Sequence, residues 1–137
     1  MSKHSQKRRW PYFSPQFPLL FAAVGIFVGA VLPWALVLGH GIRGSPLAVS
    51  WTLWAGLMTL AGGLVPWRTF FVLSALGGGG TAVALAVWQT VRILERCPLS
   101  FDCLPGPGLG LVLVSGLGAL VLVGLYAAGE LRGRRTP

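Results

Sequence analysis

The chain has 137 residues, of which 54% are hydrophobic and only 10% are charged. A soluble domain carries about 25% charged residues, and a mean hydropathy of +0.72 is too apolar for a surface that faces water. These values exclude a disordered chain, a small disulfide-stabilised domain and a nucleic-acid-binding domain. They predict a single integral membrane domain of the all-α class.

Four apolar segments are each long enough to cross a bilayer as a helix. The hydrocarbon core of about 30 Å needs about 20 apolar residues, and no segment has a charge in its central part. The segments are residues 17–38, 47–67, 69–94 and 109–128. We expect an antiparallel bundle of four transmembrane helices, with a basic, aromatic tail at 1–16 and a basic tail at 129–137.

Local signals mark several ends of these segments. Ser45 followed by Pro46 is typical of the N-cap and first position of a helix, which predicts the start of the second span. Pro66 leaves almost no loop before the third span, so the second and third helices should form a tight antiparallel hairpin. A Pro-Gly-Pro-Gly run at 105–108 cannot continue a helix and marks the start of the fourth.

The basic residues predict an orientation. Eight of the eleven lie in the two tails and the second-to-third turn, and three lie on the other side. The positive-inside rule then places both termini in the cytoplasm, and an even number of spans requires them to share a side. The eight are Lys3, Lys7, Arg8, Arg9, Arg68, Arg132, Arg134 and Arg135, and the three are Arg43, Arg92 and Arg96.

Tryptophans give an independent indication of the membrane boundaries, because Trp and Tyr prefer the two interfaces. With both termini inside, Trp34, Trp51 and Trp88 fall near the outer boundary, and Trp10 and Trp67 fall near the inner one. We interpret these five residues as interfacial anchors.

Small residues and one proline bear on how the helices pack. Gly25 and Gly29 have the GxxxG spacing that lets membrane helices approach closely. Pro33 lies inside the first span and predicts a kink, with residues 33–38 tilted. The run Gly77, Gly78, Gly79 and Gly80 lies in mid-membrane. It indicates either tight packing against the second helix, or a hinge or docking groove for a lipid, quinone or pigment.

Cys97 and Cys103 lie in the predicted outer loop, on the side that faces an oxidising compartment. We expect a disulfide between them. Free thiols and a redox pair facing quinone are the alternatives, although five residues intervene where thiol oxidoreductases commonly have two. No metal site or cofactor is predicted, since two cysteines without a nearby histidine do not make a zinc site.

No catalytic constellation is present in the sequence, and no Asp, Glu, Lys or Arg lies at mid-membrane depth, where coupled transporters need such groups. We therefore expect a non-enzymatic, accessory or structural subunit of a larger membrane complex, of respiratory or photosynthetic type for example. The alternatives are a small carrier or channel for a neutral or hydrophobic solute, and a quinone-linked thiol redox protein. The expected partners are membrane lipids and other integral membrane subunits or a second copy, with no nucleic acid.

The stretch Gly-Ala-Val-Leu-Pro-Trp at 29–34, the short outer loop, the Arg-bearing inner turn and the Gly-rich fourth span carry one resemblance. Over residues 18–128 the chain resembles a broad group of small four-span membrane proteins of actinobacteria and related bacteria that lack an assigned function. The resemblance implies a multi-pass protein of the bacterial inner membrane and carries over no catalytic residue. Nine arginines against two lysines also indicate a GC-rich bacterial source.

Overall fold

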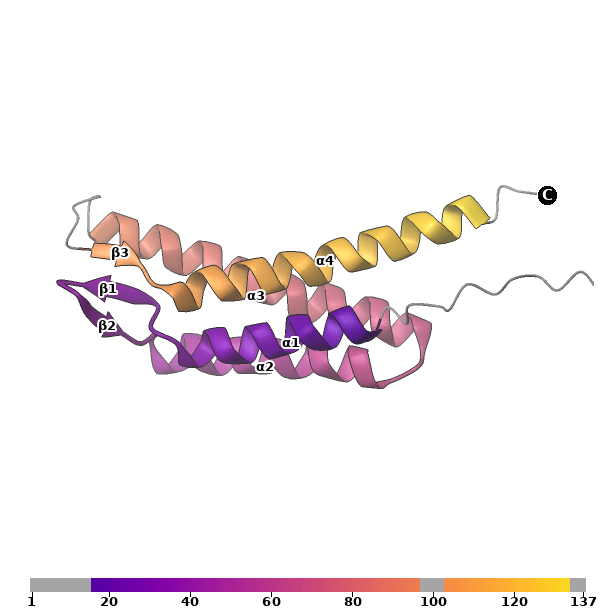
Figure 1. The fold of residues 1–137 in the computed structure, drawn as a ribbon, viewed down its shortest axis with the longest axis horizontal. Coiled ribbons are helices and arrows are strands. Elements are labelled where there is room, and N and C mark those ends of the chain that lie inside the picture. Colours follow the sequence, from indigo (N-terminus) through magenta and orange to yellow (C-terminus); the bar gives the residue numbers. More distant parts are fainter. Residues whose placement is uncertain (1–15, 97–102, 134–137) are drawn as a thin grey trace, which may run out of the picture.

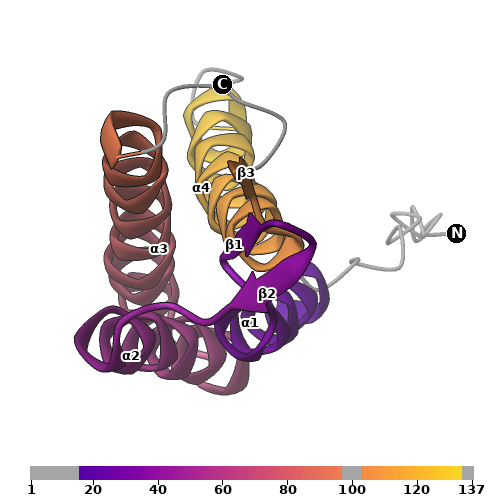
Figure 2. The same cartoon turned by 90° about the vertical axis from the view of Figure 1, so that its left-hand side faces the viewer.

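The computed structural model describes residues 16–96 and 103–133, apart from the side chains of Cys103, Glu130 and Arg132. Four helices pack together side by side (Figures 1 and 2). Each contacts two neighbours, and α1 and α3 lie on a diagonal. The helices are α1 (Gln16–Val31), α2 (Pro46–Leu64), α3 (Arg68–Arg96) and α4 (Pro107–Gly133).

Consecutive helices run in opposite directions, so the start of α1, the α2–α3 turn and the end of α4 lie at one end of the bundle (Figure 1). By length and composition, α2, α3 and α4 can each cross a membrane, whereas α1 is apolar but has only 16 residues. The predicted all-α bundle is confirmed at this level.

The predicted start of the second helix is confirmed in detail, whereas α4 begins at Pro107, two residues before the predicted residue 109 and inside the Pro-Gly-Pro-Gly run. The Ser45 hydroxyl accepts a hydrogen bond from the Ala48 amide at 3.4 Å, and Pro46 occupies the first turn of α2. The cap satisfies one of the amide groups that have no partner within the helix. Only three residues separate Leu64 from Arg68, which makes the tight hairpin that Pro66 predicted.

The prediction for the first span is wrong beyond residue 31. No tilted helical segment follows Pro33, because α1 ends at Val31 and the chain continues into strand β1 (Ala35–Val37). Proline cannot donate a backbone hydrogen bond, and it disfavours helical geometry in the residue before it. An apolar run interrupted in this way ends its helix at Pro33 rather than bending it.

Strand β1 is the centre of a small sheet at the end of the bundle away from the termini, on the side of α1 and α4 (Figures 1 and 2). Antiparallel partners flank it, β2 (His40–Ile42) on one side and β3 (Cys103–Pro105) on the other. Leu36 pairs with Gly41 in β2 and with Leu104 in β3. The sheet therefore joins the connection after α1 to the connection before α4.

Two clusters of buried apolar residues form the core. One lies near the sheet and is centred on Trp34, with Ile26, Ala48, Ala55, Ala82, Ala86, Leu109 and Val112. The other lies nearer the termini and consists of Leu19, Ala22, Phe71, Ala75, Ala119 and Val123. Most of the members on α2 and α3 are alanines, so these helices lie close together.

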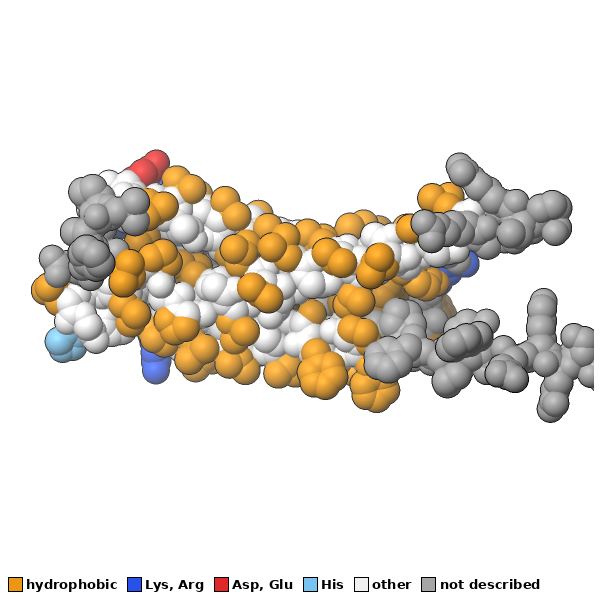
Figure 3. Space-filling model, turned by 45° about the horizontal axis from the view of Figure 1, so that its top comes forward, with side chains coloured by type: hydrophobic (Ala, Val, Ile, Leu, Met, Phe, Trp, Pro, Cys, Tyr) orange, Lys and Arg blue, Asp and Glu red, His pale blue; other side chains and the backbone are white. Residues whose placement is uncertain are grey.

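Large hydrophobic side chains cover the outside of the bundle as well. Figure 3 shows them along the length of one face, with the charged side chains of that face near the ends. Phe21, Leu57, Leu73, Val114 and Leu125 are each more than half exposed. A soluble protein rarely exposes an apolar surface of this extent, so the structure is consistent with a membrane protein.

Candidate functional site

A groove of about 810 Å³ lies between the first turns of α2 and the second half of α3. Ala48, which is short and buried, leaves room at its base, while Trp51 and Trp88 form taller walls that are about half exposed. The lining residues are Ser45, Leu47, Ala48 and Trp51 at the start of α2, and Thr81, Ala84, Leu85, Trp88, Gln89, Arg92, Ile93 and Arg96 on α3.

The α3 wall of the groove changes in chemistry along its length. Residues three or four apart share one face of a helix, and the sequence Thr81, Leu85, Trp88, Arg92, Arg96 follows this spacing. The wall therefore has small or aliphatic side chains, including the hydroxyl of Thr81, where it begins, and it is aromatic in the middle and cationic at the end of α3. At 1.5 Å per residue the gradient extends over about 22 Å.

Arg92 is held against the aromatic part of this wall. Its guanidinium carbon lies 4.6 Å from the centre of the Trp88 ring. This geometry is a cation–π contact, in which the flat guanidinium stacks on the indole. A cation–π contact uses the charge of the guanidinium and not its N–H donors, so these donors stay available for a ligand.

The N-terminus of α2 forms the opposite wall of the groove. A helix N-terminus carries a partial positive charge and amide groups without partners inside the helix. The Ser45 hydroxyl accepts a hydrogen bond from the Ala48 amide, and Pro46 has no amide hydrogen. None of the described residues that line the groove is acidic. Arg92 and Arg96 therefore dominate its charge, and they outweigh the partial negative charge at the C-terminus of α3.

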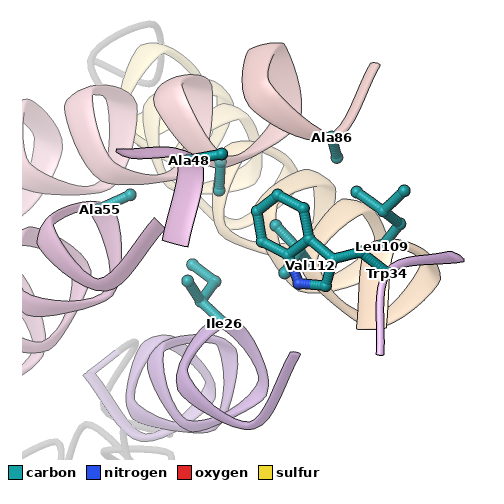
Figure 4. Packing of buried hydrophobic residues seen from close by; sticks show 8 residues of the cluster. Ile26, Trp34, Ala48, Ala55, Ala86, Leu109 and Val112 are labelled. Atoms are coloured by element: carbon teal, nitrogen blue, oxygen red, sulfur yellow. The ribbon is translucent and has the colours of Figure 1, made fainter. Parts of the chain in front are cut away.

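The tryptophans do not all act as surface anchors. Trp51 and Trp88 are about half exposed on the groove, and Trp67 is 74% exposed at the opposite end. The prediction is wrong for Trp34, which is 3% exposed and lies among Ile26, Leu109 and Val112 (Figure 4). Trp10 lies outside the described residues.

Trp34 is enclosed because the backbone folds around it. Its amide donates to the Ile42 carbonyl at 2.9 Å, and its carbonyl accepts from the Gly106 amide at 2.7 Å. A β-carbon placed on Gly44 would lie 2.6 Å from the Trp34 ring. Residues 42–44 and the distant Gly106 therefore both close around Trp34, and hydropathy alone gives no sign of that.

The predicted glycine contacts are found on α1. A β-carbon on Gly25 would collide with the Ser115 hydroxyl, and one on Gly29 would lie 2.7 Å from Val112 and 2.9 Å from the Gly108 carbonyl oxygen. Gly25 and Gly29 are therefore the surface on which α4 packs.

The four-glycine run divides into two inward and two outward positions. Gly78 faces α2, where a β-carbon would collide with the Thr59 hydroxyl, and Gly79 faces α4 next to Ala119. Gly77 and Gly80 have nothing within 4 Å of an added β-carbon. Helix α3 continues unbroken through the run, so the packing interpretation is supported and the run contains no helix break.

The cysteine prediction is not addressed by the structure. Cys97 and the Cys103 side chain lie outside the described residues, so the disulfide and its redox alternative stay predictions. Among the described residues, no group of three His, Cys, Asp or Glu side chains is placed to hold a metal ion.

The groove is the feature that the sequence analysis missed. Its signal was present in the 3–4 residue spacing of Trp88, Arg92 and Arg96, but these residues were interpreted separately, as an anchor and as outer-side charges. Comparisons with protein-family models, curated proteins and solved structures gave no match. The resemblance to small four-span proteins therefore stays a prediction.

Proposed function

We propose that the protein is an integral membrane protein with four membrane-spanning helices, which works by contact as an accessory or structural subunit. The observation that carries this proposal is the combination of an apolar outer surface with an interior closed by backbone contact. The first property suits a lipid environment, and the second suits a fixed scaffold.

Helix α1 is too short to cross the membrane by itself, and the strand that follows it supplies the missing length. Its 16 residues measure about 24 Å, which is short of a hydrocarbon core of about 30 Å. Residues 32–37 supply the remaining length in extended form. Non-helical backbone at that depth must have its polar groups satisfied within the protein, and β1 meets this requirement because strands pair with it on both sides.

The packing of the interior favours a contact role over a carrier. A carrier that rocks about the glycine run needs freedom between α3 and its neighbours. Instead, Gly79 and Gly116 touch through their backbones, and Gly78 lies directly against Thr59 and Ala55. Moving α3 would break both contacts at once. The groove begins next to the glycine run, at Thr81, and extends to the end of α3. It is open to the outside and offers a place where a further molecule can bind.

Mild-detergent purification, followed by mass spectrometry of co-purifying proteins, tests the contact role. We expect a constant set of integral membrane proteins to remain with the chain, and we expect the chain alone to move no solute across liposomes. If the chain purifies without partners and moves a solute across the membrane of liposomes, the carrier interpretation replaces the contact role.

The outward glycines offer a sharper version of the same test. Gly77 and Gly80 face away from the bundle, so leucine at both positions should leave the fold intact while it obstructs a partner at α3. A reduced yield of co-purifying proteins with unchanged membrane insertion supports contact through this face. An unchanged yield of co-purifying proteins contradicts a partner at this face of α3. The contact would then belong to another face of the bundle.

A further inference from the structure

We propose that the α2–α3 groove binds one anionic phospholipid, with its phosphate at Arg92 and Arg96 and an acyl chain between Trp51 and Trp88. The proposal rests on the membrane placement proposed above, and it goes further by naming the molecule that the groove receives.

The order of side chains along the groove matches the order of layers in a membrane leaflet. Tryptophans prefer the boundary between hydrocarbon and headgroups, which places Trp51 and Trp88 at that level. Leu85 and Thr81 then face the acyl chains. Arg92 lies one helical turn beyond Trp88, about 6 Å farther out, and Arg96 lies one turn beyond Arg92. The Arg92 guanidinium lies back over the Trp88 ring, at the boundary, and Arg96 lies one turn nearer to the lipid phosphates. Long arginine side chains at these positions can both reach a phosphate.

The charge of the groove selects an anion. Arg92 and Arg96 line the same face, and the described lining residues include no carboxylate. The Arg92 guanidinium already lies over the Trp88 ring, and a side chain that is partly ordered before a ligand arrives lowers the entropic cost of binding. A guanidinium edge can bind two phosphate oxygens at once.

The size and position of the groove favour a lipid over a partner helix. Its volume of about 810 Å³ lies within the range of roughly 300–1,000 Å³ typical of small-molecule sites. A helix is about 10–12 Å wide and would contact α2 and α3 along their whole length. The groove instead is confined to the end of the pair that carries the two arginines.

Quenching of tryptophan fluorescence by brominated lipids tests the charge requirement. The full-length protein is reconstituted in vesicles that contain brominated phosphatidylglycerol or brominated phosphatidylcholine, and the relative affinity for the two lipids is measured. We expect a clear preference for phosphatidylglycerol, which each of R92Q and R96Q lowers by about fivefold. R43Q removes an equal charge at the same end but outside the groove, and it should leave the preference unchanged.

A second pair of variants tests the apolar part of the groove without changing its charge. Ala84→Leu fills space in the groove, and Val87→Phe adds comparable bulk to an exposed position on α3 that does not line it. We expect the first variant to weaken the association of phosphatidylglycerol and the second to leave it unchanged. Soluble glycerol 3-phosphate should not displace the lipid, since it lacks the acyl chain.

Equal affinity for the two lipids, or an R43Q effect as large as that of R92Q, would overturn the lipid site. Displacement of the lipid by glycerol 3-phosphate would show that the groove recognises the phosphate alone and not the acyl chain. Alkaline extraction of the same vesicles tests the membrane placement independently of the lipid site. Release of the protein by alkali contradicts the membrane placement, whereas a retained protein without lipid preference contradicts only the lipid site.

Discussion

The indole N–H of Trp34 donates a hydrogen bond to the carbonyl oxygen of Gly29 at 3.0 Å. In a continuing helix, that carbonyl would accept from the amide four residues later, which is the position of Pro33. Proline has no amide hydrogen. The side chain that follows Pro33 therefore supplies the donor that Pro33 lacks, and the bond closes the end of α1 inside the core.

Trp34→Phe should therefore destabilise the protein. The change leaves a buried carbonyl without its donor, which costs about 1–3 kcal/mol, and it removes part of a ring that fills the core. The free energy of unfolding in detergent measures the effect. Trp67→Phe, at a position 74% exposed, is the control and should have little effect. Equal stability of the two variants would show that the Trp34 bond contributes nothing.

Gly79 and Gly116 offer a second test, because a β-carbon on either would lie 3.0 Å from the carbonyl oxygen of the other. Gly79→Ala should force α3 and α4 apart and lower the stability by about 1–3 kcal/mol. Gly80→Ala is the matched control on the next residue. Its added methyl group meets nothing, so it should stabilise α3 by up to about 1 kcal/mol. Thermal unfolding compares the two, and the same sign for both changes would refute the assigned rotation of α3.

Leu38 occupies the hairpin turn between β1 and β2 with a φ of 49°, and Gly39 follows at 77°. A left-handed conformation costs a residue such as leucine about 1–2 kcal/mol. Leu38→Asn should stabilise the protein by about 1 kcal/mol, since Asn-Gly is the preferred pair for this turn. Leu38→Val should destabilise it, because a β-branched residue tolerates this conformation poorly. Unfolding experiments on both variants give the comparison, and a more stable valine variant would contradict the turn.

The sequence predicted α2, α3 and α4 well because their boundaries depend on local signals. Ser45 caps its own helix, Pro66 lies in the turn between α2 and α3, and Pro107 takes the first position of α4, where a proline is well tolerated. The strand at Ala35–Val37 was missed because a short apolar run is compatible with either a helix or a strand. Its partner β3 lies more than 60 residues away in the chain, so the choice was made by a contact that no local pattern contains.

At the candidate site, too, local signals could be predicted and contacts between separate segments could not. GxxxG spacing predicted the packing of Gly25 and Gly29, since that signal lies on one helix. Which glycines of the run at 77–80 face inward depends on the rotation of α3 against two neighbours, and spacing alone does not give this rotation. Trp34 was assigned to the membrane surface because its position near a span end is typical of anchors. Its burial depends instead on Gly44 and Gly108, which close around the ring.

The central claim, that α1 crosses the membrane together with the other three helices, is tested most directly by the accessibility of single cysteines. The background carries Cys97→Ser and Cys103→Ser, and a cysteine is introduced at His40, which is exposed on β2, or at Ser2 or Thr136. In intact cells an impermeant thiol reagent should label His40→Cys, and it should label Ser2→Cys and Thr136→Cys only after the membrane is opened. Labelling of His40→Cys and Ser2→Cys from the same side would contradict the crossing of α1 and the four-span account.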